Sequence, residues 1–415
     1  GREKMAVIRP FCAVRPAVEY ADKVAALPYD VYNRAEAKKE VEREPLSFLA
    51  IDRAETQFED SVSVYAPEVY AKAKELFEER ISQGIFVEDK QSAYYIYQLE
   101  MNGRTQTGIA ACASVDDYLD GTIKKHENTR EEKEQDRIRH VDTLSAQTGP
   151  IFLAYRSQAT INQLVSKIME TQEPLYDFTA SDGIAHRMWK VTEEAVTTLQ
   201  EAFAGIQEIY IADGHHRAAS AVKVGLKRRK EHPDYDGTEE FNYFLSVLFP
   251  DDQLMIMDYN RCVKDLHGLT KEAFLKAVEE CFDVTVLDGA KHPQAKGQIT
   301  MYLENRWYLL QAKQELLAIT DPVAALDVSL LQEYLLKPVL GIEDPRTDER
   351  IDFIGGIRGL EELERRVQTD MTVAFAMYPT SIGELFAVAD AGLLMPPKST
   401  WFEPKLRSGL LMHRI

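Results

Sequence analysis

The sequence predicts a mixed α/β fold of the α+β class. Predicted strands and helices alternate without a regular βαβ period, and two pairs of strands are joined by hairpin signals. Hydrophobic residues make up 45% of the 415 residues, which is the ordinary globular range of about 45–50%. We therefore expect a folded chain in which helices surround several antiparallel hairpins.

The N-terminal half contains helix and hairpin signals in turn. Pro67 fits the first position of a helix from Pro67 to Arg80, which Gly84 ends. Asn102-Gly103 is a strong hairpin signal between strands at 93–100 and 104–115. Thr129 and Glu132 predict a capping box for a helix from about 130 to 146. The elements expected next are a strand at 151–155, a helix at 193–204, a buried strand at 208–212 and a helix from 215 to about 227.

Further strands and helices are predicted in the C-terminal half. Pro250-Asp251-Asp252 predicts a second hairpin, between strands at 243–249 and 254–259. The later elements are a helix capped by Thr270, strands at 284–287, 298–303, 307–312 and 372–377, a helix from 326 to 340, and a helix whose capping box is Ser381 with Glu384. Domain limits are weakly marked, and we expect an N-terminal α+β region at 1–120, a core at 121–260 and a C-terminal α+β region at 261–415.

The composition disfavours several classes of function. The net charge of −19 shows no basic footprint for nucleic acid, and the compact cluster Lys227–Lys230 fits a solvated helix end. No stretch of about 18 uncharged apolar residues occurs, and Gly1–Ala6 lacks the apolar segment of a secretory signal. Cys12, Cys112, Cys262 and Cys281 are scattered and are expected to be reduced structural thiols. We expect a cytoplasmic protein.

The strongest candidate site is Asp213-Gly214-His215-His216-Arg217. A hydrophobic strand ends here, glycine makes the turn, and a helix begins with free N–H groups, an arrangement that binds anions. The histidines and Arg217 add donors for phosphate oxygens, and with His126 they would concentrate cations against the acidic total. The alternatives are a capped turn with solvated histidines, or a zinc site, although no HExxH or cysteine partner lies nearby.

A second candidate is Lys124-Lys125-His126-Glu127-Asn128-Thr129, just before the next helix. A carboxylate at that position, beside histidine and lysine, could accept a proton, orient a hydroxyl or hold a metal. Alternatively, Glu127 only complements the helix dipole. Asp136 and Arg137 on the same helix form either a structural salt bridge or a phosphate support.

Three weaker candidates remain. Leu27-Pro28-Tyr29-Asp30-Val31 suits a rigid loop that presents the Asp30 carboxylate, with an Asx-turn as the alternative. Gly355–Gly359 matches neither GxGxxG nor a P-loop and is expected to be structural. In the tail from Met395 to Lys405, lysine, serine and threonine side chains could contact an anion. Trp401 and Phe402 are expected to close a core.

These motifs together resemble one bacterial and archaeal family. The resemblance rests on five segments in this order: Pro28-Tyr29-Asp30, His126–Thr129 with Asp136-Arg137, Asp213–Arg217, Leu326–Glu333 and Met395–Thr400. They are similar to those of the domain of unknown function ten-fifteen family, also described as SerK-like. The likeness runs from Ala6 to Ile415, with Leu27 where a second proline is common. Around its Gly-His-x-Arg turn, that family is similar to the ParB and sulfiredoxin superfamily, which implies a ParB/sulfiredoxin-like core.

The resemblance implies an enzyme, a nucleotide-dependent phosphotransferase related to free serine kinases that form O-phosphoserine. The implied cofactors are ATP or ADP with Mg²⁺. Gly214, His215, His216 and Arg217 would cradle the phosphates beside Asp213, and Glu127, or else Asp30, would accept the proton. His126, Arg137 and Lys398 would be secondary anion contacts, and the metal ligands stay undefined. The competing function is a non-catalytic, nucleotide-responsive regulator of the ParB type. The implied partners are a nucleotide and a small-molecule substrate, with a homodimer left open.

Overall fold

The computed structural model describes residues 6–415 and divides the chain into two compact units. Unit 1 extends to Leu254 and also includes Pro404–Ile415, whereas unit 2 is Met255–Glu403. The chain therefore leaves unit 1 once and returns to it near the C-terminus. The predicted limit at 120 falls inside unit 1, and the predicted limit at 260 lies just beyond Leu254. The predicted absence of an apolar signal concerns residues that lie mostly outside the described part, which begins at Ala6.

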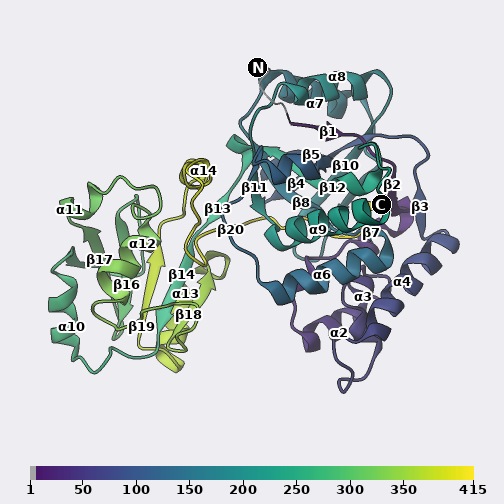
Figure 1. The fold of residues 1–415 in the computed structure, drawn as a ribbon. Coiled ribbons are helices and arrows are strands. Elements are labelled where there is room, and N and C mark those ends of the chain that lie inside the picture. The colour runs from purple at the N-terminus through teal and green to yellow at the C-terminus, as the bar shows by residue number, and fades with distance from the viewer. Residues whose placement is uncertain (1–5) are drawn as a thin grey trace. The chain divides into compact units, whose positions relative to one another are not determined.

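Unit 1 is built on a nine-stranded mixed sheet (Figure 1). Its order is β6-β11-β8-β12-β5-β4-β10-β9, and β1 also pairs with β5. The β6/β11 and β8/β12 pairs are parallel and the others are antiparallel, which confirms the mixed class. The strands are β1 (Ile8–Arg9), β4 (Tyr94–Met101), β5 (Arg104–Ser114), β6 (Ile123–Lys124), β8 (Ile151–Tyr155), β9 (Tyr176–Thr179), β10 (Ala185–Val191), β11 (Ile209–Asp213) and β12 (Tyr243–Pro250). The predicted hairpin at Asn102-Gly103 is confirmed between β4 and β5.

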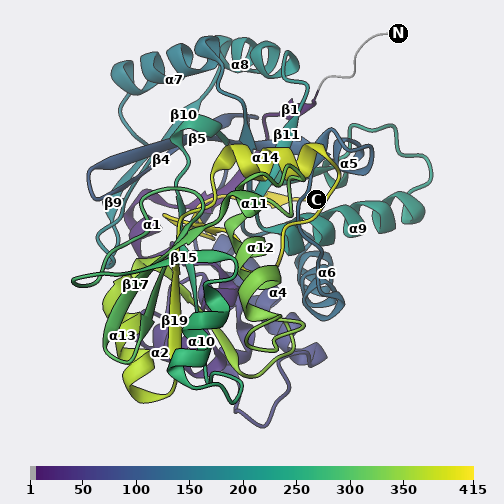
Figure 2. The same ribbon diagram turned by 90° about the vertical axis from the view of Figure 1, so that its left-hand side faces the viewer.

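Helices bury the apolar residues of this sheet. The helices α7 (Ala159–Thr171) and α8 (Glu194–Ala204) lie side by side in both views (Figures 1 and 2). The helix α9 (His215–Glu231) packs along α6 (Glu131–Leu144). Together, α7, α8 and α9 contribute to one apolar cluster with the strands, because Ile161, Phe203 and Ala221 are buried in it. This cluster fixes the position of α9, which carries the main candidate motif.

A second layer of unit 1 combines helices with a four-stranded sheet of order β3-β2-β21-β7. Its strands are β2 (Ala13–Pro16), β3 (Phe86–Glu88), β7 (Ala146–Gln147) and β21 (Met412–Arg414). The remaining α-helices of unit 1 are α1 (Ala21–Val24), α2 (Arg34–Arg43), α3 (Leu49–Asp52), α4 (Pro67–Ser82) and α5 (Val115–Leu119). Short 3₁₀ helices are formed by Val18–Tyr20, Tyr29–Val31, Ala54–Gln57, Glu240–Asn242 and Asp251–Gln253. Phe48, Phe77 and Phe86 are packed in the core of this layer.

Unit 2 contains a six-stranded antiparallel sheet of order β15-β17-β16-β19-β14-β18 and the short pair β13/β20. The strands are β13 (Ile256–Met257), β14 (Tyr259–Val263), β15 (Phe282–Val286), β16 (Gln298–Leu303), β17 (Arg306–Ala312), β18 (Ile351–Gly355), β19 (Val373–Met377) and β20 (Trp401–Phe402). The helices are α10 (Lys271–Val278), α11 (Gln314–Leu317), α12 (Asp327–Leu331), a π-helix (Gln332–Leu336), a 3₁₀ helix (Gly356–Arg358), α13 (Gly359–Thr369) and α14 (Ile382–Asp390). The capping box of Ser381 with Glu384 is confirmed. Among residues 6–415, none of the helices has the length and apolar character needed to cross a bilayer.

Three local predictions are wrong. The strands around Pro250 do not form a hairpin: β12 pairs with β5 and β8, and β13 pairs with β20 in unit 2. The turn at Asp251 is therefore the exit from unit 1. Thr129 does not cap α6, because Arg130 is the N-cap residue, without a side-chain cap, and the Thr129 hydroxyl donates to Glu134. The helix expected over 326–340 is interrupted after Leu331 by the π-helical segment.

Candidate functional site

The candidate phosphate turn joins β11 to α9 through Gly214. The pairing register of β11 with β8 shifts between Ile211 and Asp213, just before the turn. Gly214 has φ +90°, a left-handed conformation that glycine adopts without strain. No side chain caps the first turn of α9. The side-chain cap of the alternative interpretation is therefore absent, and the anion site at these N–H groups stays a prediction.

The loop at residues 126–130 is held against this turn by two hydrogen bonds. The backbone N–H of His126 donates to Nε2 of His215 (3.3 Å), and the backbone N–H of Arg130 donates to Nε2 of His216 (2.9 Å). The imidazole rings of His126 and His215 pack edge to face with centroids 4.5 Å apart. Glu127 Oε2 lies 3.4 Å from His215 Nδ1. The structure thus brings the two strongest sequence motifs together.

These contacts determine the protonation of the three histidines. Because Nε2 of His215 and of His216 each accepts a hydrogen bond, their protons are on Nδ1. Burial lowers the pKa of His126 and of His216, and it lowers the pKa of His215 well below its ordinary value. The histidines are therefore neutral at pH 7, and the expectation that they add positive charge is wrong. They can serve as N–H donors and as acceptors.

Two of these rings have a buried nitrogen without a hydrogen-bond partner in the described part of the chain. His126 donates from Nε2 to the carbonyl of Ala212 (3.4 Å), so its Nδ1 is an acceptor, and this atom has no donor. His215 Nδ1–H faces Glu127 at ion-pair distance but makes no hydrogen bond. Only 1% of His126 and 4% of His215 is exposed. Buried polar atoms are normally satisfied, so these two nitrogens point to a ligand with polar groups.

Arg217 is positioned by a buried carboxylate that sequence reasoning missed. Its Nη2 donates to Asp52 Oδ2 (3.3 Å), and its guanidinium lies 5.1 Å from the centre of the Tyr29 ring. Asp52 also accepts from the Thr148 hydroxyl (2.9 Å). Burial opposes ionisation of Asp52, but the charge of Arg217, with the other partners, outweighs burial and the pKa is lowered. Arg217 makes no further side-chain hydrogen bond in the described chain and keeps 12% exposure, so donors remain for a ligand.

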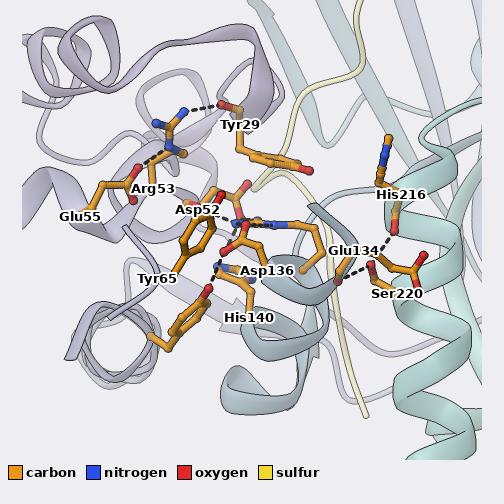
Figure 3. Close-up of polar contacts among 12 residues, drawn as sticks. Tyr29, Asp52, Arg53, Glu55, Tyr65, Glu134, Asp136, His140, His216 and Ser220 are labelled. Atoms are coloured by element: carbon orange, nitrogen blue, oxygen red, sulfur yellow. Dashed lines mark hydrogen bonds and ion pairs between the residues drawn. The ribbon is translucent and has the colours of Figure 1, made fainter. Parts of the chain in front are cut away.

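Arg137 joins the same network from α6. It pairs with Asp136 (2.8 Å) and lies 3.9 Å from the centre of the Tyr29 ring. Figure 3 shows Asp52, Asp136 and His140 gathered below Tyr29, with His216 and Ser220 on α9 beyond Glu134. Of the two alternatives for Asp136 and Arg137, the structural salt bridge is present, and the role of Arg137 in phosphate binding stays a prediction. Tyr29 is held between residues of two motifs, and Asp30 follows it on an exposed turn.

Gly149 has no side chain, and the guanidinium of Arg217 occupies the space where one would lie. A Cβ atom at Gly149 would lie 2.7 Å from Cζ of Arg217 and 2.8 Å from Oγ of Ser408. A cavity of about 10 Å³, at the lower limit for holding one water, lies next to these residues and is also lined by Arg137 and Ser220. A wider groove of about 600 Å³ lies between α4 and α6 and contains none of the predicted site residues.

His140 should make stability depend on pH. Burial, followed by the charge of Arg137, lowers the pKa of His140 to about 4. Between pH 6.5 and 4 the unfolded chain binds a proton that the folded chain does not, so the free energy of unfolding falls as the pH falls. In His140→Gln, we expect this slope to decrease by about 1.4 kcal/mol per pH unit near pH 5. Urea unfolding between pH 4.5 and 7 measures it, with the exposed His232→Gln as control. An unchanged slope in His140→Gln would contradict the neutral assignment.

The other predicted residues differ in their placement. The charges of Asp30 and Asp213 act on His216, so Asp30 lies near the α9 turn. Lys398 belongs to unit 2, where its carbonyl accepts from Arg261, and its role as an anion contact stays a prediction. Asp52, Thr148 and Gly149 were missed. The signal that could have indicated Asp52 is an acidic residue directly after the apolar run Leu49–Ile51.

Several solved structures are similar to this chain. A free serine kinase in complex with AMP is 15% identical, with a TM-score of 0.36, over 73% of this chain and 91% of that chain. A conserved hypothetical protein from Pyrococcus furiosus is 15% identical, with a TM-score of 0.35, over 73% and 94%. SbnI with a C-terminal truncation from Staphylococcus aureus is 12% identical, with a TM-score of 0.33, over 71% and 84%. Likenesses this weak assign no activity to this chain.

No curated protein matches the sequence. The family described as protein of unknown function (DUF1015) matches residues 8–329, which is most of the chain. The expected family resemblance is thereby confirmed, and the chain belongs to the DUF1015 family.

Proposed function

We propose that the protein is a nucleotide-dependent phosphotransferase whose acceptor is a small hydroxyl compound, with free L-serine as the first candidate. The observation that carries this proposal is the convergence of the 126–130 loop on the open N-terminus of α9. An uncapped helix N-terminus, an arginine and neutral N–H donors form a suitable cradle for phosphate oxygens. A carboxylate stands beside that cradle, as proton transfer requires.

Glu127 is the proposed general base. It is half-exposed, and the Nδ1–H of the buried His215 faces it, so its carboxylate is reachable by substrate yet oriented by the protein. The acceptor oxygen would form a bond to the terminal phosphorus while the bond between that phosphorus and its bridging oxygen breaks. The hydroxyl proton would pass to Glu127, and the nucleotide would leave with one phosphate fewer. Positioning and charge stabilisation would supply most of the rate.

The residues present fit Mg²⁺ bound mainly through phosphate oxygens. Among residues 6–415, no group of three or more His, Cys, Asp or Glu side chains is arranged to hold a metal ion. Mg²⁺ often uses only one or two carboxylates together with phosphates and water. Asp30 is the carboxylate that would contribute, because Glu127 is proposed as the base. The ion would neutralise charge on the transferred phosphate.

The direct test is product formation. Purified protein is incubated with Mg²⁺, L-serine and either ATP or ADP, and O-phosphoserine is measured by mass spectrometry. ADP and AMP are the ligands of similar solved free serine kinases, which makes ADP an early choice of donor. Product with either nucleotide supports the proposal. Nucleotide binding without turnover, accompanied by a change in oligomeric state, would select the regulatory alternative.

Arg217→Lys should weaken nucleotide binding about 10- to 100-fold, because a hydrogen bond to a charged group is worth about 1.5–3 kcal/mol and lysine lacks the guanidinium fork. Lysine keeps the positive charge facing Asp52, which limits the effect on folding. Isothermal titration calorimetry with ADP and ATP measures the change. The matched control is Lys227→Ala, at an exposed position near the other end of α9. Equal affinities of wild type and Arg217→Lys would remove Arg217 from the site.

A further inference from the structure

The chain returns from unit 2 to unit 1 along the phosphate turn. We call Pro404–Ile415 the C-terminal strap. Ser408 exchanges two backbone hydrogen bonds with Ala26, and the N–H of Gly409 donates to the carbonyl of Thr148 (3.2 Å). The side chain of Arg407, of which 3% is exposed, pairs with Asp182. The strap is thus fixed to the segments that precede Tyr29 and Gly149, and its path is firmly defined.

The strap places Lys405 beside the turn. Lys405 Nζ lies 3.4 Å from Asp213 Oδ2, while Asp213 Oδ1 accepts the N–H of Gly214 (2.9 Å). One carboxylate therefore connects the ammonium group to the backbone of the turn that begins α9. The side chain of Asp213 is 50% exposed and that of Lys405 is 19% exposed. Because Asp213 is half-exposed, water screens its attraction to Lys405, and a phosphate oxygen can replace Asp213 as an ion-pair partner of Lys405.

Lys405 adds to the cations that surround the turn. The three histidines are neutral and Arg217 shares its charge with Asp52, while the charges of Lys125, Arg130 and Lys133 also act on His215 and His216. A nucleoside di- or triphosphate brings several negative charges, which cations must balance. The buried Nδ1 of His126, which has no hydrogen-bond donor in the described part of the chain, is an independent indication that a polar ligand binds beside the first turn of α9.

We propose that Lys405 binds the phosphates of the nucleotide at the α9 turn, exchanging Asp213 for a phosphate oxygen. This inference rests on the proposed function. It assigns a binding residue to the C-terminal strap, which lies outside the residues that the family model matches. In this scheme Asp213 competes with the phosphates for Lys405, and it also repels them.

The test is calorimetric binding of ADP, ATP and adenosine to the full chain at two salt concentrations. We expect Lys405→Ala to lower the affinity for ADP and ATP about tenfold, to reduce its salt dependence, and to leave adenosine binding unchanged. Lys405→Arg, which keeps the charge, should stay within about threefold of wild type. Asp213→Asn retains an acceptor for the Gly214 N–H and should bind ADP and ATP no more weakly than wild type. Lys227→Ala is the charge-matched control.

The sign of the Asp213→Asn effect separates the proposal from a purely structural pair. If Lys405 only anchors Asp213, both Lys405→Ala and Asp213→Asn weaken binding equally, and the proposal is overturned. If Lys405→Ala binds ADP and ATP as tightly as wild type does, the proposal for Lys405 is overturned, while the proposed function stands. A wild-type chain that binds neither ADP nor ATP overturns the proposed function, and this inference with it.

Discussion

Replacing Asp52 by asparagine is expected to lower the free energy of unfolding by about 3–5 kcal/mol, which is the usual cost of removing one partner from a buried charge network. The Asp52 side chain is 1% exposed, it accepts hydrogen bonds from Arg217 and Thr148, and Nη1 of Arg137 lies 3.8 Å from its Oδ1. An amide would place its own donors against them and leave two guanidinium groups undercompensated. Urea unfolding followed by circular dichroism measures the loss.

Asp60→Asn is the matched control for the Asp52 prediction. Its side chain is 80% exposed and lies 3.8–4.0 Å from Arg34 and Lys38, so the same chemical change should cost less than about 1 kcal/mol. If Asp52→Asn were as stable as Asp60→Asn, the carboxylate would not be the group that holds Arg217. Nucleotide affinity of Asp52→Asn, measured below its unfolding transition, should fall together with that of Arg217→Lys.

Glu127→Gln is expected to lower kcat about 10²- to 10⁴-fold, which is the usual contribution of a general base. Glutamine has the size of glutamate but cannot take up the proton of the substrate hydroxyl at neutral pH. The carboxylate lies against the imidazole of His215 and is proposed to act on the acceptor hydroxyl, so ADP and ATP affinity should change by less than about threefold. Steady-state rates of phosphoserine formation, with calorimetric affinities, give both values.

Asp30→Asn distinguishes the two carboxylates named from the sequence. Asp30 lies near His216 on an exposed turn, whereas Glu127 is directed by a buried imidazole. We therefore expect Asp30→Asn to lower kcat by less than about tenfold. A large loss in Asp30→Asn with near-normal Glu127→Gln would transfer the role of base to Asp30.

The sequence was informative where structure is local. A strand, a glycine and a helix in succession predicted the β11–α9 turn, because each feature depends on neighbouring residues. The Asn102-Gly103 hairpin followed for the same reason. The charge of the site could not be predicted without the fold. Burial keeps His215 neutral, and this burial depends on the 126–130 loop, which is far away in the sequence.

Other features depend on contacts that no local pattern encodes. Asp52 reads as an ordinary helix end until Arg217, 165 residues later, packs against it. The residues around Pro250 have the composition of a hairpin turn, yet the pairing of β12 with β5 and β8 leaves no place for the next strand. Thr129 and Glu132 have the spacing of a capping box, but the two histidines of α9 hold that loop in another position.

The C-terminal strap also affects the order in which the two units can fold. In the small sheet, β21 lies between β2 and β7, so Met412 pairs with Val14 across nearly the whole chain. Unit 2 is one uninterrupted segment and can fold as soon as it leaves the ribosome, whereas unit 1 waits for residues made after it. A chain that terminates early inside unit 2 would therefore also leave unit 1 without β21 and without Lys405.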